Sequence, residues 1–168
     1  RYGIYELIKA FKQIKNPNVE LLICGHHFNL RELHDKIRDD RRINFLGLLS
    51  VEDVLKFEAG AIANINPRPF SEDLDRFSIP SKTLEYLYSG RPTISVRNSI
   101  LQEHFPDELI WSKTASVEDL LGCMEQVLLM SEKERVELGK RAQERVIKLY
   151  SLSAISEKIK DFLTGFSQ

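Results

Sequence analysis

Short apolar runs alternate with longer amphipathic stretches along most of this chain of 168 residues. Runs that are apolar throughout are typical of strands in a parallel sheet covered on both faces, and helical spacing marks the stretches between them. Strands are predicted at 19–24, 43–46, 61–65, 92–96 and 108–111. Helices are predicted at 5–14, 30–37, 51–57 and 80–90, and in a helical C-terminal tail at about 116–130, 131–148 and 152–164. This order predicts an α/β fold with a parallel sheet flanked by helices.

The N-terminal end departs from this alternation, because a helix begins almost at the first residue with no strand before it. The first βα unit therefore looks cut, and we expect residues 1–168 to form a single domain whose first strand is missing. In that case the strands on either side of the missing one should be unpaired or newly paired. No strand follows the helical tail, so we expect it to pack around the sheet edge or to reach a second domain.

Composition excludes several classes of function. A net charge of −1 argues against nucleic acid as the main partner. No apolar run approaches the ~18–20 residues that cross a bilayer, and we expect a cytoplasmic protein. The four histidines have no zinc-ligand spacing, so no metal site is expected. Cys24 and Cys123 lie in different local patterns and are predicted to be buried free thiols.

The candidate site follows the third predicted strand, since ligands of open α/β sheets bind beyond the carboxyl ends of strands. A long polar loop, 66–78, leads into a helix that Pro80 opens. The N–H groups of Ser81 and Lys82 would be free at the positive end of that helix, with the charge of Lys82 beside them. Such an end suits an anion, particularly phosphate. The alternative is that Ser78 or a loop carboxylate caps the helix.

Glu85 lies one turn after Ser81 and three residues after Lys82, on the loop-facing side of the same helix. A carboxylate there is well suited to accept two hydrogen bonds from a ribose diol. The alternative is a solvated ion pair with Lys82. His26 and His27 directly follow a strand, so they are candidates to line a ligand cleft.

With these residues in view, the chain resembles the C-terminal, nucleotide-sugar-binding half of a GT-B glycosyltransferase of the group 1 (family 4) type. The similar segments are, in order, 2–4 with 7–11, 21–25, 43–47, 80–82 with 85–87, Gly90 and Pro92, and 138–139 with Arg141 and Tyr150. The resemblance implies one Rossmann-like half of a GT-B fold within a two-domain enzyme. It implies transfer of a sugar, with retention at the anomeric carbon, from a UDP- or GDP-linked donor to a glycan or lipid-linked acceptor.

The resemblance also assigns roles. Glu85 matches the glutamate that holds the ribose hydroxyls, and the stretch from Ser78 through Ile79 to Lys82 matches the segment whose amides face the diphosphate. Leu48 matches the position whose backbone meets the nucleobase, and Gly25 matches the glycine turn, with His26 beside it. Catalytic residues are not assigned, and neither a cofactor nor a metal ion is implied. The acceptor would bind mainly on the N-terminal half, so this chain alone should catalyse little or nothing.

For the complete enzyme, the same resemblance suggests surface polysaccharide or lipopolysaccharide assembly and peripheral association with a membrane. Two alternatives are kept. One is a nucleotide-sugar epimerase of GT-B architecture, and the other is a non-catalytic, flavodoxin-like or response-regulator-like interaction module.

The sequence departs from the family pattern at three places. Phe77 stands where the family has its first glutamate, so either the sugar is held differently or a nearby acid substitutes. The candidate acids are Glu72, Asp73 and Asp75. His27 replaces the second glycine of the turn after the first predicted strand. The family's arginine and lysine on the diphosphate belong to the missing strand and the first helix, where Tyr2 occupies the lysine's position and Arg1 is a partial substitute.

Overall fold

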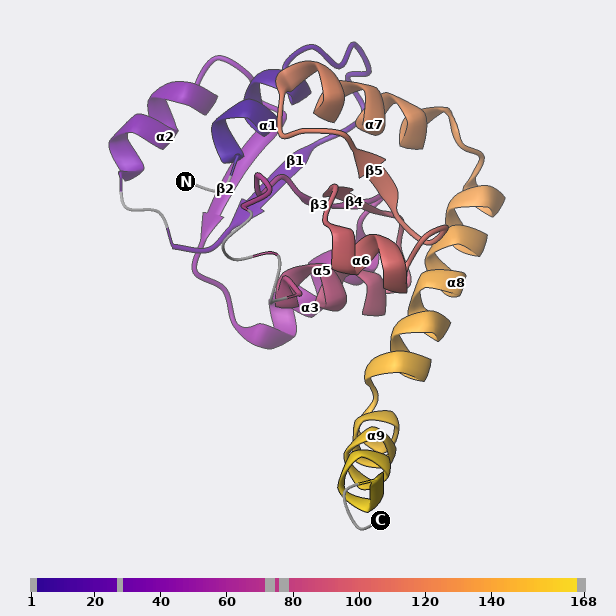
Figure 1. Ribbon diagram of the computed structural model, residues 1–168. Helices are drawn as coiled ribbons and strands as arrows, with labels where there is room; N and C mark the ends of the chain where they lie inside the picture. The colour runs from indigo at the N-terminus through magenta and orange to yellow at the C-terminus, as the bar shows by residue number, and fades with distance from the viewer. Residues whose placement is uncertain (1–2, 27–28, 72–74, 76–78, 166–168) are drawn as a thin grey trace.

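Two parallel sheets form the centre of the protein in a computed structural model that describes residues 3–26, 29–71, 75 and 79–165 (Figure 1). β1 (Leu21–Cys24) pairs with β2 (Ile43–Gly47) in one sheet. β3 (Asn64–Asn66), β4 (Thr93–Val96) and β5 (Ile110–Ser112) form the other, with β4 in the middle. All the strand pairs are parallel, which confirms the predicted α/β class.

Helices connect the strands and flank the sheets. They are α1 (Ile4–Phe11), α2 (Leu30–Ile37), α3 (Val51–Gly60), α5 (Ser81–Tyr88), α6 (Ser99–His104), α7 (Val117–Leu129), α8 (Glu132–Tyr150) and α9 (Leu152–Gly165). The predicted N-cap of α3 is confirmed, since the Ser50 side chain accepts a hydrogen bond from the Asp53 N–H. Ser131 and Glu134 form the predicted capping box at the start of α8. Among the helices that the structure describes, α6 was not predicted, because six residues are too few for a helical period to be seen.

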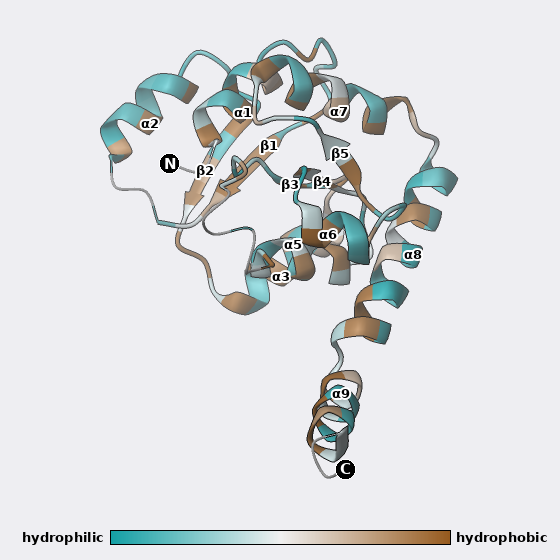
Figure 2. Ribbon diagram, viewed as in Figure 1, coloured by the Kyte–Doolittle hydropathy of each residue, from teal (hydrophilic) through white to brown (hydrophobic). Residues whose placement is uncertain are grey.

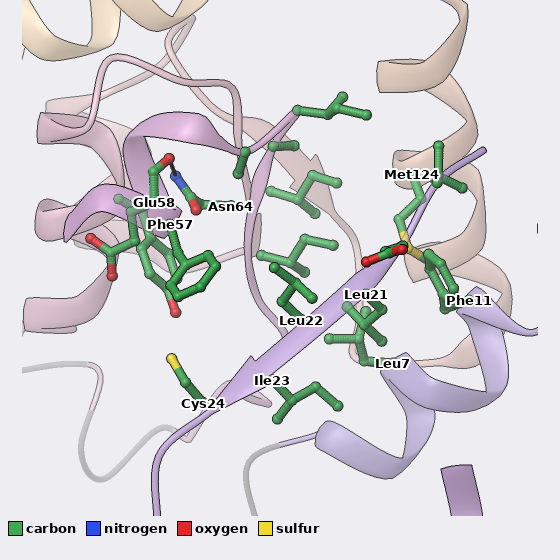
Figure 3. A pocket seen from close by; sticks show the side chains of 18 of the residues that line it. Leu7, Phe11, Leu21, Leu22, Ile23, Cys24, Phe57, Glu58, Asn64 and Met124 are labelled. Atoms are coloured by element: carbon green, nitrogen blue, oxygen red, sulfur yellow. Dashed lines mark hydrogen bonds between the residues drawn. The ribbon is translucent and has the colours of Figure 1, made fainter. Parts of the chain in front are cut away.

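The two sheets do not join within the described part of the chain. The facing edges of β1 and β3 are not paired with each other, so the expectation that two strands of the sheet are left unpaired along one edge is confirmed. A cavity of about 410 Å³ lies there, and Leu22 and Ile23 of β1, Ile65 of β3 and Phe11 of α1 contribute to its largely apolar lining (Figure 3). The cavity therefore has the unpaired edges of β1 and β3 on two sides and helix α1 on a third.

This gap explains where the burial prediction fails. Residues in β4 are buried on both faces, as expected, but those in β1 alternate, with Leu21 and Ile23 buried and Leu22 exposed. Cys24 follows the same alternation and is exposed, so its predicted burial is wrong. The reason is that Leu22 and Cys24 line the cavity instead of packing against a further layer. Cys123 is buried as predicted, and both thiols are free.

Two apolar clusters hold the remaining elements together. The larger joins α1, α2, the strands and α7, while the smaller lies beneath α5, α6 and α8 around Leu87, Leu101 and Phe105. At this second cluster α8 comes very close to the turn that ends α5. A Cβ atom built at Gly139 would lie 2.0 Å from the carbonyl oxygen of Gly90, so only glycine permits this approach.

The helical tail divides into a packed part and a projecting part. α7 lies against α1 and α8 lies against α5, whereas α9 extends away from the body of the protein (Figures 1 and 2). None of the side chains of α9 is buried, and Leu152, Phe162 and Leu163 are all more than half exposed. Among the described residues, no helix is both long and apolar enough to cross a membrane.

Candidate functional site

The carboxyl ends of β1 and β2 meet at the edge where the site was predicted. The N–H of Gly25 donates to the carbonyl oxygen of Gly47, with a nitrogen-to-oxygen distance of 2.8 Å. This bond brings Gly25 and His26 next to the segment that carries Leu48. Leu48 itself is 75% exposed.

The start of α5 lies beside the end of β3. Asn66, the last residue of β3, donates from its side-chain amide to the hydroxyl of the buried Thr83. Pro80 is the N-cap, so α5 begins at Ser81, one residue later than predicted. The Pro80 carbonyl accepts from the Thr83 and Leu84 N–H groups. Within the described ranges, no acceptor bonds to the N–H groups of Ser81 and Lys82. Among the residues that the structure describes, these two donors at the positive end of the helix have no partner.

Lys82 and Glu85 lie against each other on the exposed side of α5. The Lys82 Nζ atom is 2.6 Å from Glu85 Oε1, so the ion pair considered as the alternative interpretation does form. The pair is not freely solvated, since about a third of the Glu85 side chain is exposed and Glu58 also approaches Lys82. The pair lies at the N-terminal end of α5, beside the N–H groups of Ser81 and Lys82.

Glu58 of α3 is a residue of this site that sequence analysis missed. Its side chain is only 8% exposed, and its Oε1 atom lies 3.8 Å from Lys82 Nζ. Burial and the nearby Glu85 carboxylate raise the pKa of Glu58 to about 7, although Lys82 opposes the shift. The helical period gave no signal for it, because Val51, seven residues earlier on the same face of α3, is 77% exposed.

Cys24 and Tyr86 complete this group of titratable side chains. Figure 3 shows Cys24 pointing from the end of β1 toward Phe57 and Glu58 of α3. Partial burial raises the pKa of the Cys24 thiol, against the opposing effect of Lys82. Burial, with a smaller effect from Glu58, raises the pKa of Tyr86 to about 12, so its hydroxyl is neutral at physiological pH. For Lys82, burial favours the neutral amine, but Glu85 and Glu58 outweigh it and raise the pKa.

Asp75, one of the acids that could substitute for the first glutamate of the family, lies in the loop before α5. Asp75 is buried, its Oδ1 lies 2.8 Å from Arg68 Nη2, and its Oδ2 accepts from the Ser71 N–H. These bonds fix Asp75 inside the loop, which argues against its binding a sugar. Several other residues considered in the sequence lie outside the described residues, namely Arg1, Tyr2, His27, Glu72, Asp73, Phe77 and Ser78.

The structure thus brings most of the predicted site residues to one edge of the sheets. Ser81, Lys82 and Glu85 share the start of α5, and Cys24, just before Gly25, is near enough to Lys82 for their charges to interact. Ile79 differs, because it is half-buried and packs against the cluster beneath α5. In the described part of the chain, no three His, Cys, Asp or Glu side chains gather as a metal would require.

Comparison with known proteins places these features in a family. The model of a family described as glycosyl transferase-like matches residues 5–161. No curated protein matches the sequence.

Solved structures share the fold at low sequence identity. Sucrose-phosphate synthase from Thermosynechococcus elongatus is 21% identical with a TM-score of 0.80, and the match covers 99% of this chain and 42% of that one. Anabaena HepE in complex with UDP is 17% identical with a TM-score of 0.81 over 98% of this chain and 45% of that one. HepE in complex with UDP-glucose has the same identity and coverage and a TM-score of 0.74. The chain spans less than half the length of these structures.

Proposed function

We propose, because this chain belongs to the glycosyl transferase-like family, that it is the donor-binding domain of a retaining glycosyltransferase. Its fold is that of one half of a GT-B enzyme. The observation that carries the proposal is the start of α5, where an ammonium, a carboxylate and two N–H groups without an acceptor among the described residues lie within one helical turn. Each of these groups has a partner in a nucleotide sugar.

The diphosphate would bind at the N-terminus of α5. The N–H groups of Ser81 and Lys82, with those of Ile79 and the loop at Ser78, would donate to its oxygens, and the Lys82 ammonium would lie alongside. Hydrogen bonds between charged groups and phosphate are stronger than neutral ones. When the sugar leaves, negative charge grows on the diphosphate, and the same donors would stabilise that charge in the transition state.

The ribose would bind to Glu85. In the absence of ligand, Lys82 occupies one oxygen of this carboxylate at 2.6 Å. A carboxylate has about four acceptor positions, so the ribose diol has room to donate two hydrogen bonds once Lys82 turns to the diphosphate. Gly25, His26 and the backbone near the exposed Leu48 would then border the nucleobase, since they lie at the same sheet edge.

The donor and acceptor classes are also part of the proposal. HepE has been crystallised with UDP and with UDP-glucose, which supports a UDP-linked hexose as the first donor to test, with a GDP-linked sugar second. The chain spans less than half of the similar structures, so we assign the glycan or lipid-linked acceptor to another domain. We propose that the complete enzyme is cytoplasmic, associates with the membrane surface and serves polysaccharide assembly.

Thermal unfolding with nucleotide sugars tests this function. We expect a raised midpoint with UDP-glucose or GDP-mannose, and a much smaller rise in the Glu85→Ala variant. Ligand at 100 times its dissociation constant adds about 2.7 kcal/mol to the free energy of unfolding, so even modest affinity is visible. No stabilisation by any nucleotide sugar at millimolar concentration would argue for a non-catalytic module. In the complete enzyme, an epimerised nucleotide sugar without transfer to an acceptor would identify an epimerase instead.

A further inference from the structure

The buried carboxyl group of Glu58 is not explained by the fold. Its side chain is only 8% exposed, and Oε2 has no hydrogen-bond partner among the described residues. Oε1 is 3.8 Å from Lys82 Nζ, which is too long for a hydrogen bond. The neighbouring Asn64 side chain donates to the Glu58 backbone carbonyl and does not bond to the carboxyl group. A buried, unsatisfied carboxylate is costly, so this group needs either a proton or a cation.

The surroundings of Glu58 favour a proton. Lys82 and Glu85 face it from α5, Tyr86 is on the same helix, and Cys24 approaches from β1. Lys82 is the only cation in this group, and it already bonds to Glu85 at 2.6 Å. With both carboxylates ionised, the cluster carries a net charge of −1. A single proton on Glu58 would make it neutral and give Oε2 or Oε1 a hydrogen to donate to Glu85.

We propose that Glu58 is a positioning residue of the donor site that takes up one proton when a nucleotide sugar binds. This inference rests on the proposed function. The diphosphate adds two negative charges and draws Lys82 away from the carboxylates, which leaves Glu58 and Glu85 facing each other without their cation. A proton from solvent then bonds to Glu58, and its O–H donates to Glu85. That hydrogen bond holds the Glu85 carboxylate in place while its remaining acceptor positions bind the ribose diol.

The proposal fixes the direction of the pH dependence. The free protein holds its Glu58 proton below a pKa of about 7, so binding at pH 6 takes up little. At pH 8 most of the free protein has lost this proton and must recover it on binding. Affinity for the nucleotide sugar should therefore fall as the pH rises above 7, by up to about tenfold for each pH unit. In Glu58→Gln the amide donates permanently, so its affinity should stay near the wild-type value at pH 6.

Titration calorimetry with UDP-glucose at pH 8, in buffers of different ionisation enthalpy, tests the inference. UDP-glucose is the probe because its phosphates do not titrate near neutral pH. We expect uptake of about one proton by the wild type and by Glu52→Gln, an exposed control on the same helix, and close to none by Glu58→Gln. Equal uptake by Glu58→Gln would assign the proton to another group and overturn the inference. Wild-type binding without uptake would also overturn it.

Carbon NMR of the glutamate carboxyl groups gives a second measurement, which is made on the wild type. The Glu58→Gln variant serves only to assign the Glu58 signal. The Glu58 titration midpoint should rise when UDP-glucose is added to the wild type. A Glu58 midpoint that stays constant while UDP-glucose binds would contradict the proton uptake but leave the proposed function intact. Failure of UDP-glucose and GDP-mannose to bind at any pH would overturn the proposed function, and this inference with it.

Discussion

Lys82 and Glu85 form an ion pair of 2.6 Å across one turn of α5, next to backbone N–H groups with no acceptor in the described part of the chain. An ion pair on a helix surface contributes only about 0.3–0.5 kcal/mol to stability. Its position at a helix N-terminus, with the buried carboxyl group of Glu58 at 3.8 Å, is the arrangement on which the proposed binding of a diphosphate and a ribose rests. Three of the predictions below test parts of this arrangement.

Replacing Lys82 by methionine should weaken binding of UDP-glucose by about tenfold or more, since it removes a charged donor to the diphosphate. The salt dependence of binding should decrease at the same time, because one counter-charge is lost. Dissociation constants at low and high salt measure both effects. Lys140→Met is the matched control, as Lys140 is exposed on α8 and pairs with Glu144 at 3.8 Å. If the two variants bind alike, Lys82 does not contact the phosphate.

Glu58→Gln should stabilise the folded protein at pH 8 but not at pH 4. The pKa of Glu58 is about 7 in the folded protein and 4.5 in its ordinary state, so the folded chain holds the extra proton between these values. The contribution of the Glu58 proton to the free energy of unfolding is fully present below pH 4.5 and is lost as the pH rises to 7. The amide avoids that loss, which is up to about 3 kcal/mol. Urea unfolding at both pH values measures it, with the exposed Glu137→Gln as control. A variant that is less stable at pH 8 would contradict the shift.

Two helical glycines should respond in opposite directions to alanine. Gly139→Ala should destabilise the protein by about 1–3 kcal/mol, because the new Cβ would meet the Gly90 carbonyl at 2.0 Å and push α8 from α5. Gly122→Ala in α7 places its Cβ in open space and should stabilise the helix by about 0.5–1 kcal/mol. Thermal unfolding compares them. Equal effects would show that α8 does not pack as described.

An added strand should fill the cavity between β1 and β3. The start of α1 lies beside the end of β3, since a Cβ at Gly3 would be 2.0 Å from the Pro67 carbonyl, so a strand leading into Gly3 would end at this edge. Fusing about six β-branched apolar residues before Arg1 should raise the free energy of unfolding by about 2 kcal/mol or more. The amides of β1 and β3 should exchange with deuterium more slowly.

The control for the added strand is the same segment with a central proline, which cannot complete a ladder between two strands. If both extensions have the same stability, the segment does not pair with the sheets. If the protein without the added segment is a dimer and the extended protein is a monomer, a second copy fills the cavity when the segment is absent.

Much of the fold follows from local sequence patterns. The apolar runs and helical periods predict nearly every strand and helix, and Ser50, Ser131 and Ser151 act as the N-caps that their positions indicate. These features depend on residues within one or two helical turns of each other. The position of the start of α5 follows in the same way, because Pro80 and the residues after it are adjacent in the chain.

Features that depend on contacts between distant segments could not be predicted. Cys24 has the neighbours of a buried residue in sequence, and its exposure follows from the missing contact between two sheets. Glu58 and Lys82 are 24 positions apart, and only the packing of α3 against α5 brings their charges together. The helical period of α3 does not mark Glu58 as buried, because Val51 on the same face is exposed.

Binding of UDP-glucose by the wild type and by Glu85→Ala, measured side by side in a titration, tests the central claim most directly. Glu144→Ala is the matched control, since Glu144 is an exposed glutamate that also pairs with a lysine on its own helix. We expect the wild type and Glu144→Ala to bind equally and Glu85→Ala to bind about 10- to 100-fold more weakly, because two hydrogen bonds to a charged acceptor are lost. Equal affinity of all three proteins, or no binding by the wild type to any nucleotide sugar, would contradict the account.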